Sequence, residues 1–223
     1  MNGKTKIEKN NEYKYILIGD SSVGKTTIFK KVTTGVFFEK NISTIGIDKR
    51  TIHFQDIEVD IKGKKQKEEF KIVLFDTAGQ ERYHSITKGY FQGSDVVYIL
   101  YDITNKKTFK AVENWLESIT EALSNWKQGH YLITLFGNKL DFVNSGEKPR
   151  EVGTDEAEQL CDDKEIIWGG EISVKDLSQE ELNEQFIKTW KIFISKFGIK
   201  EKISEQKHLA GSKYVKRKKK SFC

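Results

Sequence analysis

The sequence predicts an α/β fold of three layers, in which a mostly parallel sheet is covered by helices on both faces. Two observations carry this prediction. Apolar runs typical of buried strands alternate along the chain with stretches whose apolar residues recur at helical spacing. The first run, residues 15–18, leads through a glycine-containing loop into a helix-like segment at 27–32. Because ligands of such sheets bind at the carboxyl ends of the strands, we expect the functional site there.

The other elements follow the same alternation. The strand at 51–61 changes phase near Gln55-Asp56, which predicts a bulge, and the polar segment 62–67 is expected to be a loop. Aromatic residues dominate the apolar stripe of the last helix, and we interpret them as packing residues rather than as a cofactor site. In chain order the predicted elements are strands at 15–18, 51–61, 70–75, 96–101, 131–136 and 166–168, and helices at 27–32, 109–123 and 182–197.

Composition limits the class of protein. The 223 residues suit a short N-terminal tail at 1–10, one folded domain at 11–199 and a flexible basic tail at 200–223. The two cysteines, Cys161 and Cys223, argue against a disulfide framework. No apolar stretch approaches the roughly 20 residues of a membrane span, and the start lacks the apolar core of a signal peptide. We therefore expect a cytoplasmic protein.

The basic character of the chain belongs to its tail. The net charge is +5, whereas the Lys and Arg residues between positions 213 and 220 supply six positive charges, so residues 1–212 carry −1. A folded domain with this charge is not expected to bind nucleic acid.

The strongest motif is a phosphate-binding loop. Its pattern, G-x-x-x-x-G-K-[S/T], lies between the first strand and the first helix, which is the context that it requires. The glycines allow successive backbone N–H groups to point at phosphate oxygens, and the helix N-terminus adds partial positive charge. Lys25 can reach the outer phosphates and Thr26 can coordinate Mg²⁺; the alternative is a glycine turn that happens to contain a lysine. The predicted binding residues are Gly19, Asp20, Ser21, Ser22, Val23, Gly24, Lys25, Thr26 and Thr27.

A second segment predicts chemistry at the outermost phosphate. Asp76, directly after the strand at 70–75, is placed to hold Mg²⁺, and the N–H of Gly79 can approach a γ-phosphate. Gln80 can accept and donate a hydrogen bond at once, as is needed to orient an attacking water. Taken singly, Asp and Gly at a strand end are ordinary turn residues. In register with the loop at 19–26 they predict hydrolysis, with Gln80 and Lys25 as catalytic residues.

Two further segments predict that the base is guanine. The run at 138–141 ends in Asp141, whose carboxylate can accept from the N1–H and 2-amino groups of guanine. Adenine lacks this donor pair, and unpaired polar groups can discriminate by about 10⁴–10⁵. Asn138 is expected to tie loops together, the Lys139 stem to cover one face of the base, and the backbone N–H groups at 173–175 to bind the guanine carbonyl. The predicted residues are Asn138, Lys139, Asp141, Ser173, Val174 and Lys175.

With these motifs the sequence resembles the Ras-like small GTPases over residues 11–199, and more closely the Rab family. The Rab-like pieces are the runs at 43–48, 76–82, 90–93 and 101–104. The resemblance implies a P-loop NTPase fold whose sheet has one antiparallel edge strand. It also implies that Thr44 coordinates Mg²⁺ and the γ-phosphate, which makes the metal set Thr26, Thr44 and Asp76. Phe37 would stack on the guanine, and an ordinary apolar anchor is the alternative.

The sequence departs from the Rab pattern at an aromatic surface that effectors commonly read. Lys49 stands where Rabs usually carry Phe, Phe75 replaces a Trp and Tyr83 replaces a Phe. A cation in place of an aromatic ring should change partner choice, so no effector is transferred from the family. The loop at 55–69 is longer and more charged than usual, for which we expect a solvated hairpin rather than an added contact surface.

The basic run precedes a C-terminal cysteine. Lys and Arg near an anionic leaflet contribute about 1 kcal/mol each, and a lipid chain with a basic patch anchors where one chain alone is marginal. Rabs are typically geranylgeranylated on C-terminal cysteines, which implies lipidation of Cys223, although the chain has neither a C-a-a-X box nor a double cysteine. A solvated tail, a nuclear localisation signal or a free thiol are the alternatives.

These features predict a Rab-like small GTPase that binds GTP and GDP with Mg²⁺, hydrolyses GTP slowly and switches vesicle traffic on the cytosolic face of an endomembrane. The expected partners are an exchange factor, a GTPase-activating protein, a GDP-dissociation inhibitor or escort protein, effectors on the switch surface and an anionic membrane. The alternatives are a guanine-nucleotide-binding scaffold without effective hydrolysis and a nuclear-transport-type small GTPase. An ATP-dependent kinase is disfavoured because Asp141 specifies guanine.

Overall fold

The structure is a computed structural model that describes residues 6–9, 11–38, 44, 46–61, 63–77, 89–123 and 130–204, with side chains described between residues 11 and 200. The chain divides into two compact units. The larger unit spans Asn11–Gly198, and the smaller one joins Met1–Asn10 to Ile199–Cys223.

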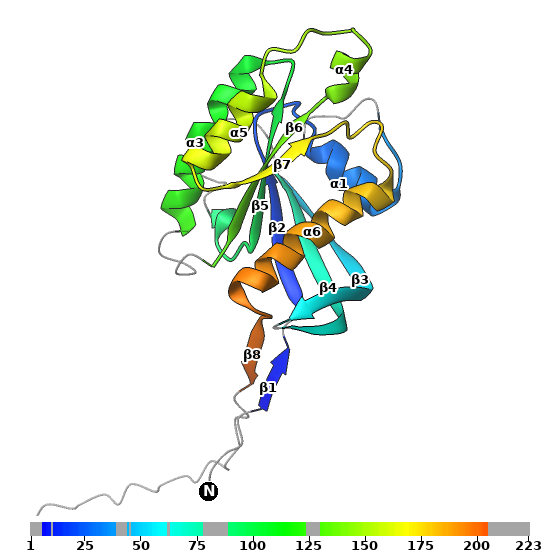
Figure 1. Cartoon of the computed structure of the whole chain (residues 1–223), viewed down its shortest axis with the longest axis vertical. Coiled ribbons are helices and arrows are strands. Elements are labelled where there is room, and N and C mark those ends of the chain that lie inside the picture. Colours follow the sequence, from blue (N-terminus) through cyan, green and yellow to red (C-terminus); the bar gives the residue numbers. More distant parts are fainter. Residues whose placement is uncertain are drawn as a thin grey trace, which may run out of the picture. The chain divides into compact units, whose positions relative to one another are not determined.

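The larger unit is built on a six-stranded sheet (Figure 1), with the strand order β3-β4-β2-β5-β6-β7. Neighbouring strands run parallel except β3 and β4, which are antiparallel and place β3 at the edge. The predicted three-layer α/β fold, with a mostly parallel sheet and one antiparallel edge strand, is therefore confirmed. The strands are β2 (Glu12–Ile18), β3 (Ile47–Ile61), β4 (Lys64–Thr77), β5 (Val96–Asp102), β6 (Leu132–Asn138) and β7 (Ile167–Glu171).

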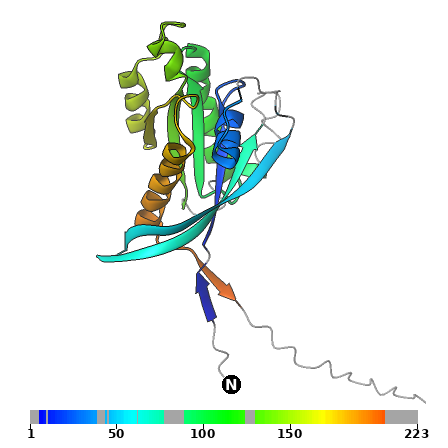
Figure 2. The same ribbon diagram turned by 90° about the vertical axis from the view of Figure 1, so that its right-hand side faces the viewer.

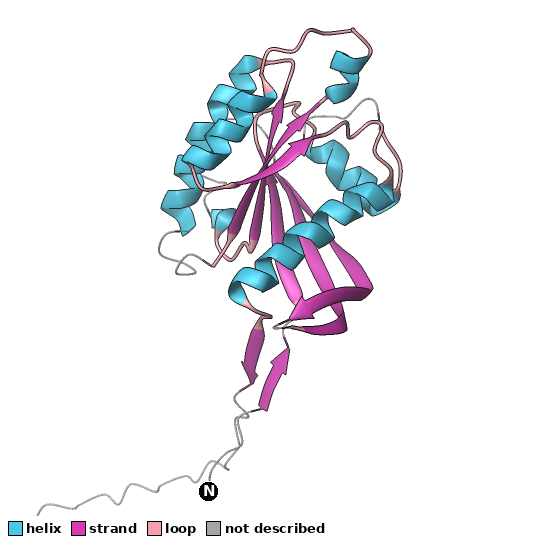
Figure 3. Ribbon diagram, viewed as in Figure 1, coloured by secondary structure: helices cyan, strands magenta, loops and turns pink. Residues whose placement is uncertain are grey.

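Helices cover both faces of this sheet, as Figure 3 shows. Helices α1 (Lys25–Thr34) and α6 (Gln179–Phe197) pack on one face, and α3 (Lys106–Leu123) and α5 (Thr154–Asp163) on the other. A short helix, α4 (Leu140–Asn144), follows β6 directly. The sequence predicted the first three of these helices, but α4 has no buried residue and α5 buries only Ala157 and Cys161, so neither carries a long apolar stripe.

The alternation of side chains along the central strands explains why they read as continuous apolar runs. On β2, Ile16 and Ile18 enter the cluster under α3 and α5, whereas the Tyr15 ring packs on Phe186 of α6 at 5.7 Å between centroids. On β5, Tyr98 also faces α6 and donates its hydroxyl to the Gln185 carbonyl. Both faces of each strand are buried, so neither face needs polar residues.

The last helix begins and packs as its sequence indicates. The Ser178 hydroxyl accepts from the backbone N–H of Glu181, whose carboxylate accepts in turn from the N–H of Ser178. Trp190, in the aromatic stripe, stacks on Phe70 of β4 with 3.8 Å between ring centroids. The interpretation of the stripe as packing residues is confirmed.

The predicted loop at 62–67 is wrong. β3 and β4 form a long curved hairpin (Figure 2), in which β3 ends at Ile61 and β4 begins at Lys64. The polar residues pair across the strands, with Glu58 opposite Lys67 and Asp60 opposite Lys65, so opposite charges support a strand where apolar alternation is lacking. The predicted bulge is confirmed: the register shifts between Phe54 and Ile57.

The smaller unit contains a two-stranded antiparallel sheet. β1 (Lys6–Lys9) pairs with β8 (Glu201–Ser204), with Lys6 opposite Ser204 and Lys9 opposite Glu201. The segments that the sequence predicts as tails thus contain one strand each. Among the described helices, none combines the length and apolar character that crossing a bilayer requires.

Candidate functional site

A cavity of about 330 Å³ opens at the carboxyl ends of the parallel strands. Its lining includes residues that the sequence predicted as ligand-binding: Ser21, Ser22, Gly24, Lys25, Thr26, Thr27, Phe37, Thr44, Asn138, Lys139, Asp141, Val174 and Lys175. Phe38, Thr77 and Phe142 complete the lining. Five predicted residues, Gly19, Asp20, Val23, Asp76 and Ser173, support this lining from behind through contacts described below. Gly79, Gln80 and Cys223 lie outside the described residues.

Two glycines shape the loop between β2 and α1. Gly19 has a φ of 129°, and a Cβ there would lie 2.2 Å from the Leu100 carbonyl oxygen. Gly24 has a φ of 108°, and a Cβ there would lie 2.2 Å from Nδ2 of Asn138. A side chain at either position would therefore meet both backbone strain and a clash. Helix α1 begins directly after Gly24 without a side-chain cap, and its first residues line the cavity, so its partial positive charge is directed at a ligand there.

Lys25 is a buried cation held over the loop. Its Nζ donates to the carbonyl oxygens of Gly19 at 2.8 Å and Asp20 at 2.7 Å. Burial lowers the pKa of this ammonium from 10.5 to about 8, while the carboxylates of Asp76 and Asp20 oppose the change. A cation kept so poorly solvated interacts strongly with any anion that enters the cavity.

The three predicted metal ligands come together at one corner of the cavity. The hydroxyl oxygen of Thr26 lies 2.7 Å from that of Thr44 and donates to Oδ2 of Asp76 at 2.6 Å. Within the described part of the chain, Oδ1 of Asp76 is buried without a hydrogen-bond partner. Burial accordingly raises the pKa of this carboxyl above its usual value, against the hydrogen bond from Thr26 and the charge of Lys25.

Asn138, at the end of β6, joins the opposite wall to the phosphate loop. Its Nδ2 donates to the Val23 carbonyl at 2.8 Å, and its Oδ1 accepts from the backbone N–H of Val174 at 3.2 Å. One side chain thus connects the segments at 19–26, 138–141 and 173–175, as the sequence predicted for it.

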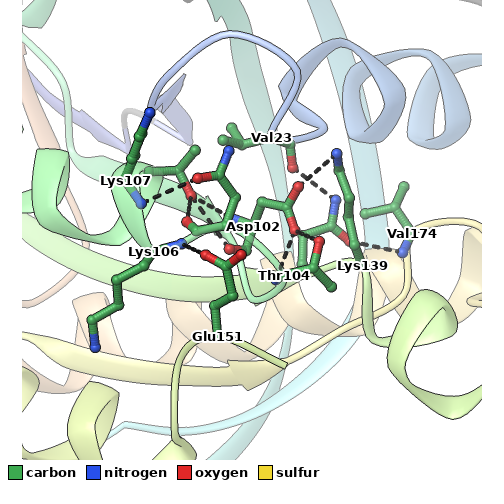
Figure 4. Close-up of polar contacts among 11 residues, drawn as sticks. Val23, Asp102, Thr104, Lys106, Lys107, Lys139, Glu151 and Val174 are labelled. Atoms are coloured by element: carbon green, nitrogen blue, oxygen red, sulfur yellow. Dashed lines mark hydrogen bonds and ion pairs between the residues drawn. The ribbon is translucent and has the colours of Figure 1, made fainter. Parts of the chain in front are cut away.

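Lys139 is held by Asp102, a residue that sequence reasoning missed. Oδ2 of Asp102 pairs with Nζ of Lys139 at 2.8 Å, and Oδ1 accepts from the N–H and the hydroxyl of Thr104 (Figure 4). The ion pair fixes the ammonium end of the Lys139 side chain. It thereby also restrains the aliphatic part of this side chain, which is expected to cover the base. Asp102 could have been recognised from its position, because it ends β5 and lies in the Rab-like run at 101–104.

The segment at 173–175 does more than the sequence predicted. The Ser173 hydroxyl donates to Oδ1 of Asp141 at 3.1 Å and so orients the carboxylate expected to read the guanine edge. The N–H of Val174 is already used by Asn138, whereas the N–H of Lys175 makes no hydrogen bond among the described residues. Of these two backbone N–H groups, that of Lys175 is therefore the better suited to bind a ligand.

Trp115, on α3, has a second role besides packing in the core. Its Nε1 donates to Oδ1 of Asp20 at 2.9 Å, so the indole also anchors the second residue of the phosphate loop. The two residues are 95 positions apart in the chain, so no local sequence pattern indicates this hydrogen bond.

Two of the three residues that depart from the Rab pattern, Lys49 and Phe75, lie on the hairpin. Lys49 of β3 lies directly opposite Phe75 of β4. On β2, the other neighbour of β4, Nζ of Lys14 lies 4.8 Å from the centroid of the Phe75 ring. Tyr83 lies outside the described residues.

Comparison with known proteins agrees with this geometry. The family model described as "Ras family" matches residues 14–195. The Ras-related protein RabC of Dictyostelium discoideum is 37% identical over 148 residues, which cover 66% of this chain and 70% of that protein. Ras-related protein Rab-10 of Caenorhabditis elegans is 38% identical over 70% of this chain and 69% of its own.

A third relative, Ras-related protein Rab-13 of Bos taurus, is 40% identical over 67% of this chain and 65% of its own length. The family match spans all but the first two residues of the sheet and all the described cavity-lining residues. The chain therefore belongs to the Ras family, as a Rab-type small GTPase.

Proposed function

We propose that this chain is a membrane-traffic switch that binds GTP and GDP with Mg²⁺ and hydrolyses GTP slowly. The observation that carries the proposal is the convergence in one cavity of a phosphate loop, an oxygen-rich corner and the guanine-reading pair Asp141 and Lys175. The GTP form would order the segments around Thr44 and after Asp76, and loss of the γ-phosphate would release them.

The corner around Asp76 fits a magnesium ion. Mg²⁺ prefers oxygen ligands, usually one or two from the protein with the rest from water and phosphates. Thr26 and Thr44 supply hydroxyl oxygens, and the unpartnered Oδ1 of Asp76 supplies a carboxylate oxygen that nothing else in the described chain satisfies. When bound, the ion would neutralise negative charge between the outer phosphates.

The chain's own residues would then stabilise the in-line attack of water on the γ-phosphate. Lys25 and the N–H groups at the start of α1 stabilise charge on the phosphate oxygens. Gln80 orients the water. The described residues bring no arginine into the cavity lining, so intrinsic hydrolysis should be slow and an activating protein would add about 10³–10⁵ in rate.

Single-turnover hydrolysis of bound GTP tests this proposal. The wild-type protein should release phosphate on the order of 10⁻⁴–10⁻³ per second. Gln80→Leu should slow that release while leaving GDP affinity unchanged. Bound GTP that stays intact in the wild-type protein would instead identify a guanine-nucleotide-binding scaffold.

The basic run at 213–220 supports a role at an anionic membrane, with Cys223 as the lipidated residue. An escort protein or GDP-dissociation inhibitor would then carry the lipidated form, and an exchange factor and effectors would act at the cytosolic face of an endomembrane. Intact-mass measurement on protein from its own cells tests the lipid. Cys223→Ser should lose membrane localisation, whereas an unmodified Cys223 peptide would contradict this part of the proposal.

A further inference from the structure

Lys31, on α1, is a buried lysine that the nucleotide chemistry above does not use. Its side chain is only 6% exposed, although α1 lies at the surface of the sheet. Nζ donates to the carbonyl oxygens of Val174 and Lys175, both at 2.8 Å, and lies 5.7 Å from the centre of the Phe37 ring. Lysine is rarely buried unless its ammonium is bonded, so these two carbonyls account for its position.

The two bonds determine where a neighbouring N–H group points. The carbonyl of Val174 and the N–H of Lys175 belong to one peptide unit, and in a trans peptide these two groups point in opposite directions. Because Lys31 holds the carbonyl toward α1, the N–H of Lys175 is turned away from that helix. Lys175 lines the cavity, and its N–H has no other acceptor among the described residues.

The same loop is fixed from its other side. Oδ1 of Asn138 accepts from the N–H of Val174, and the Ser173 hydroxyl donates to Asp141. Lys31 therefore completes a set of contacts that fixes this loop while the N–H of Lys175, a cavity-lining residue, keeps no acceptor among the described residues. Helix α1 carries Lys25 at its start and Lys31 further along, so one rigid element positions both the phosphate end and the base end of the site.

We propose that Lys31 is a positioning residue for guanine recognition, which holds the peptide between Val174 and Lys175 so that the Lys175 N–H can bind the 6-oxo group of the base. The inference rests on the proposed function, because it assigns this donor to guanine. It predicts that Lys31 affects nucleotides only through the 6-oxo group.

The test combines Lys31→Met with removal of that oxygen from the ligand. Dissociation constants are measured for GDP and for 2-aminopurine riboside diphosphate, which lacks the 6-oxo group, on the wild-type chain and on the variant. Lys31→Met should weaken GDP roughly ten-fold, as expected for a bond that a charged donor supports, and should change the affinity for the analogue by less than about two-fold. Lys31→Arg, which keeps the donors, should restore GDP affinity to within about two-fold of the wild type.

Lys30→Met is the matched control, since it removes a neighbouring charge from the same helix, and its Nζ lies 5.2 Å from the centre of the Phe38 ring rather than at the two carbonyls that Lys31 binds. It should leave the ratio of the two affinities as in the wild type. If Lys31→Met does not fold, Lys31→Gln replaces it, because the amide keeps one donor group and should give an intermediate loss confined to GDP.

Equal losses for GDP and the analogue, or no loss for either, would overturn the assignment to Lys31 while leaving nucleotide binding intact. Failure of the wild-type chain to prefer GDP over the analogue would instead contradict the proposed guanine recognition itself.

Discussion

The two ends of the cavity differ in how far their polar groups are satisfied by the protein. At the base end, Asn138, Lys139 and Ser173 each bond to a group on another segment. At the phosphate end, Oδ1 of Asp76 is buried without a partner in the described chain, and Lys25 is a cation whose pKa burial lowers to about 8. The base end is thus preorganised, whereas the phosphate end requires its ligands to complete it.

This difference suggests a division of labour. A set of fixed donors and acceptors is suited to selecting one base, because it need not rearrange when the base binds. The unsatisfied carboxylate oxygen of Asp76 and the poorly solvated ammonium of Lys25 make the structure of the phosphate end depend on what is bound there, which is what a switch requires.

Asp141→Asn should change the selectivity of the base end. The amide can no longer accept from both the N1–H and the 2-amino group of guanine, so GDP affinity should fall by about 10⁴-fold. Xanthosine diphosphate, which carries an oxygen at position 2, should become the preferred ligand. Competition binding measures both, and Asp162→Asn on the exposed side of α5 is the control that should change neither. A variant that still prefers GDP would contradict the role of Asp141.

Thr26→Asn should affect the phosphate end. It replaces a hydroxyl that bonds to Asp76 by a larger amide, so GTP affinity in Mg²⁺ should fall by about 100-fold, with GDP less affected. Titration with a fluorescent GTP analogue measures the loss. Thr33→Asn makes the same exchange on α1, where the hydroxyl donates only within the helix, and should bind GTP normally. Unchanged GTP affinity in Thr26→Asn would remove Thr26 from the metal site.

Lys25→Met should change how stability depends on pH in the nucleotide-free protein. Below pH 8 Lys25 is charged in both states, so its burial destabilises the folded chain. Between pH 8 and 10.5 the folded state loses its proton first, and the stability of the wild type rises relative to the variant. The variant should therefore be more stable at pH 7 by at most about 3 kcal/mol, and the difference should vanish near pH 10.5. Urea unfolding from pH 7 to 10.5 measures the free energy of unfolding of both proteins. A difference between them that stays constant with pH would contradict the role assigned to the burial of Lys25.

Ser173→Ala should produce the smallest change. It removes one hydrogen bond to the Asp141 carboxylate, which is worth about 1 kcal/mol, or roughly five-fold in GDP affinity. Ser173→Thr keeps the hydroxyl and should bind GDP nearly as well as the wild type. A loss in Ser173→Thr as large as in Ser173→Ala would show that the backbone of the loop, rather than this hydroxyl, orients Asp141.

Local patterns predicted the parts of the molecule that depend on local chemistry. Strands buried on both faces read as apolar runs, and the glycines of the phosphate loop stand where φ reaches 129° and 108°. The hairpin beyond residue 61 was predicted as a loop because its residues are polar and lack apolar alternation, and the oppositely charged residues that face each other across its strands are recognised only once the register is known.

The residues that support the site were harder to predict. Asp102, Trp115 and Lys31 act through partners 37, 95 and more than 140 positions away, so their roles depend on the folded arrangement. The same holds for β1 and β8, which pair across nearly the whole length of the chain. The chemistry of the motif residues can be predicted from the sequence, whereas the residues that orient them can be identified only in the folded structure.

The division between the two ends is tested most directly by measuring the affinities of GDP and inosine diphosphate in Mg²⁺ and after chelation with EDTA. Inosine lacks the 2-amino group that Asp141 is expected to bind, so the ratio of the two affinities reports on the base end alone. We expect chelation to weaken both ligands by about ten-fold or more while their ratio stays constant. Affinities that do not respond to chelation, or a ratio that collapses with it, would contradict the account.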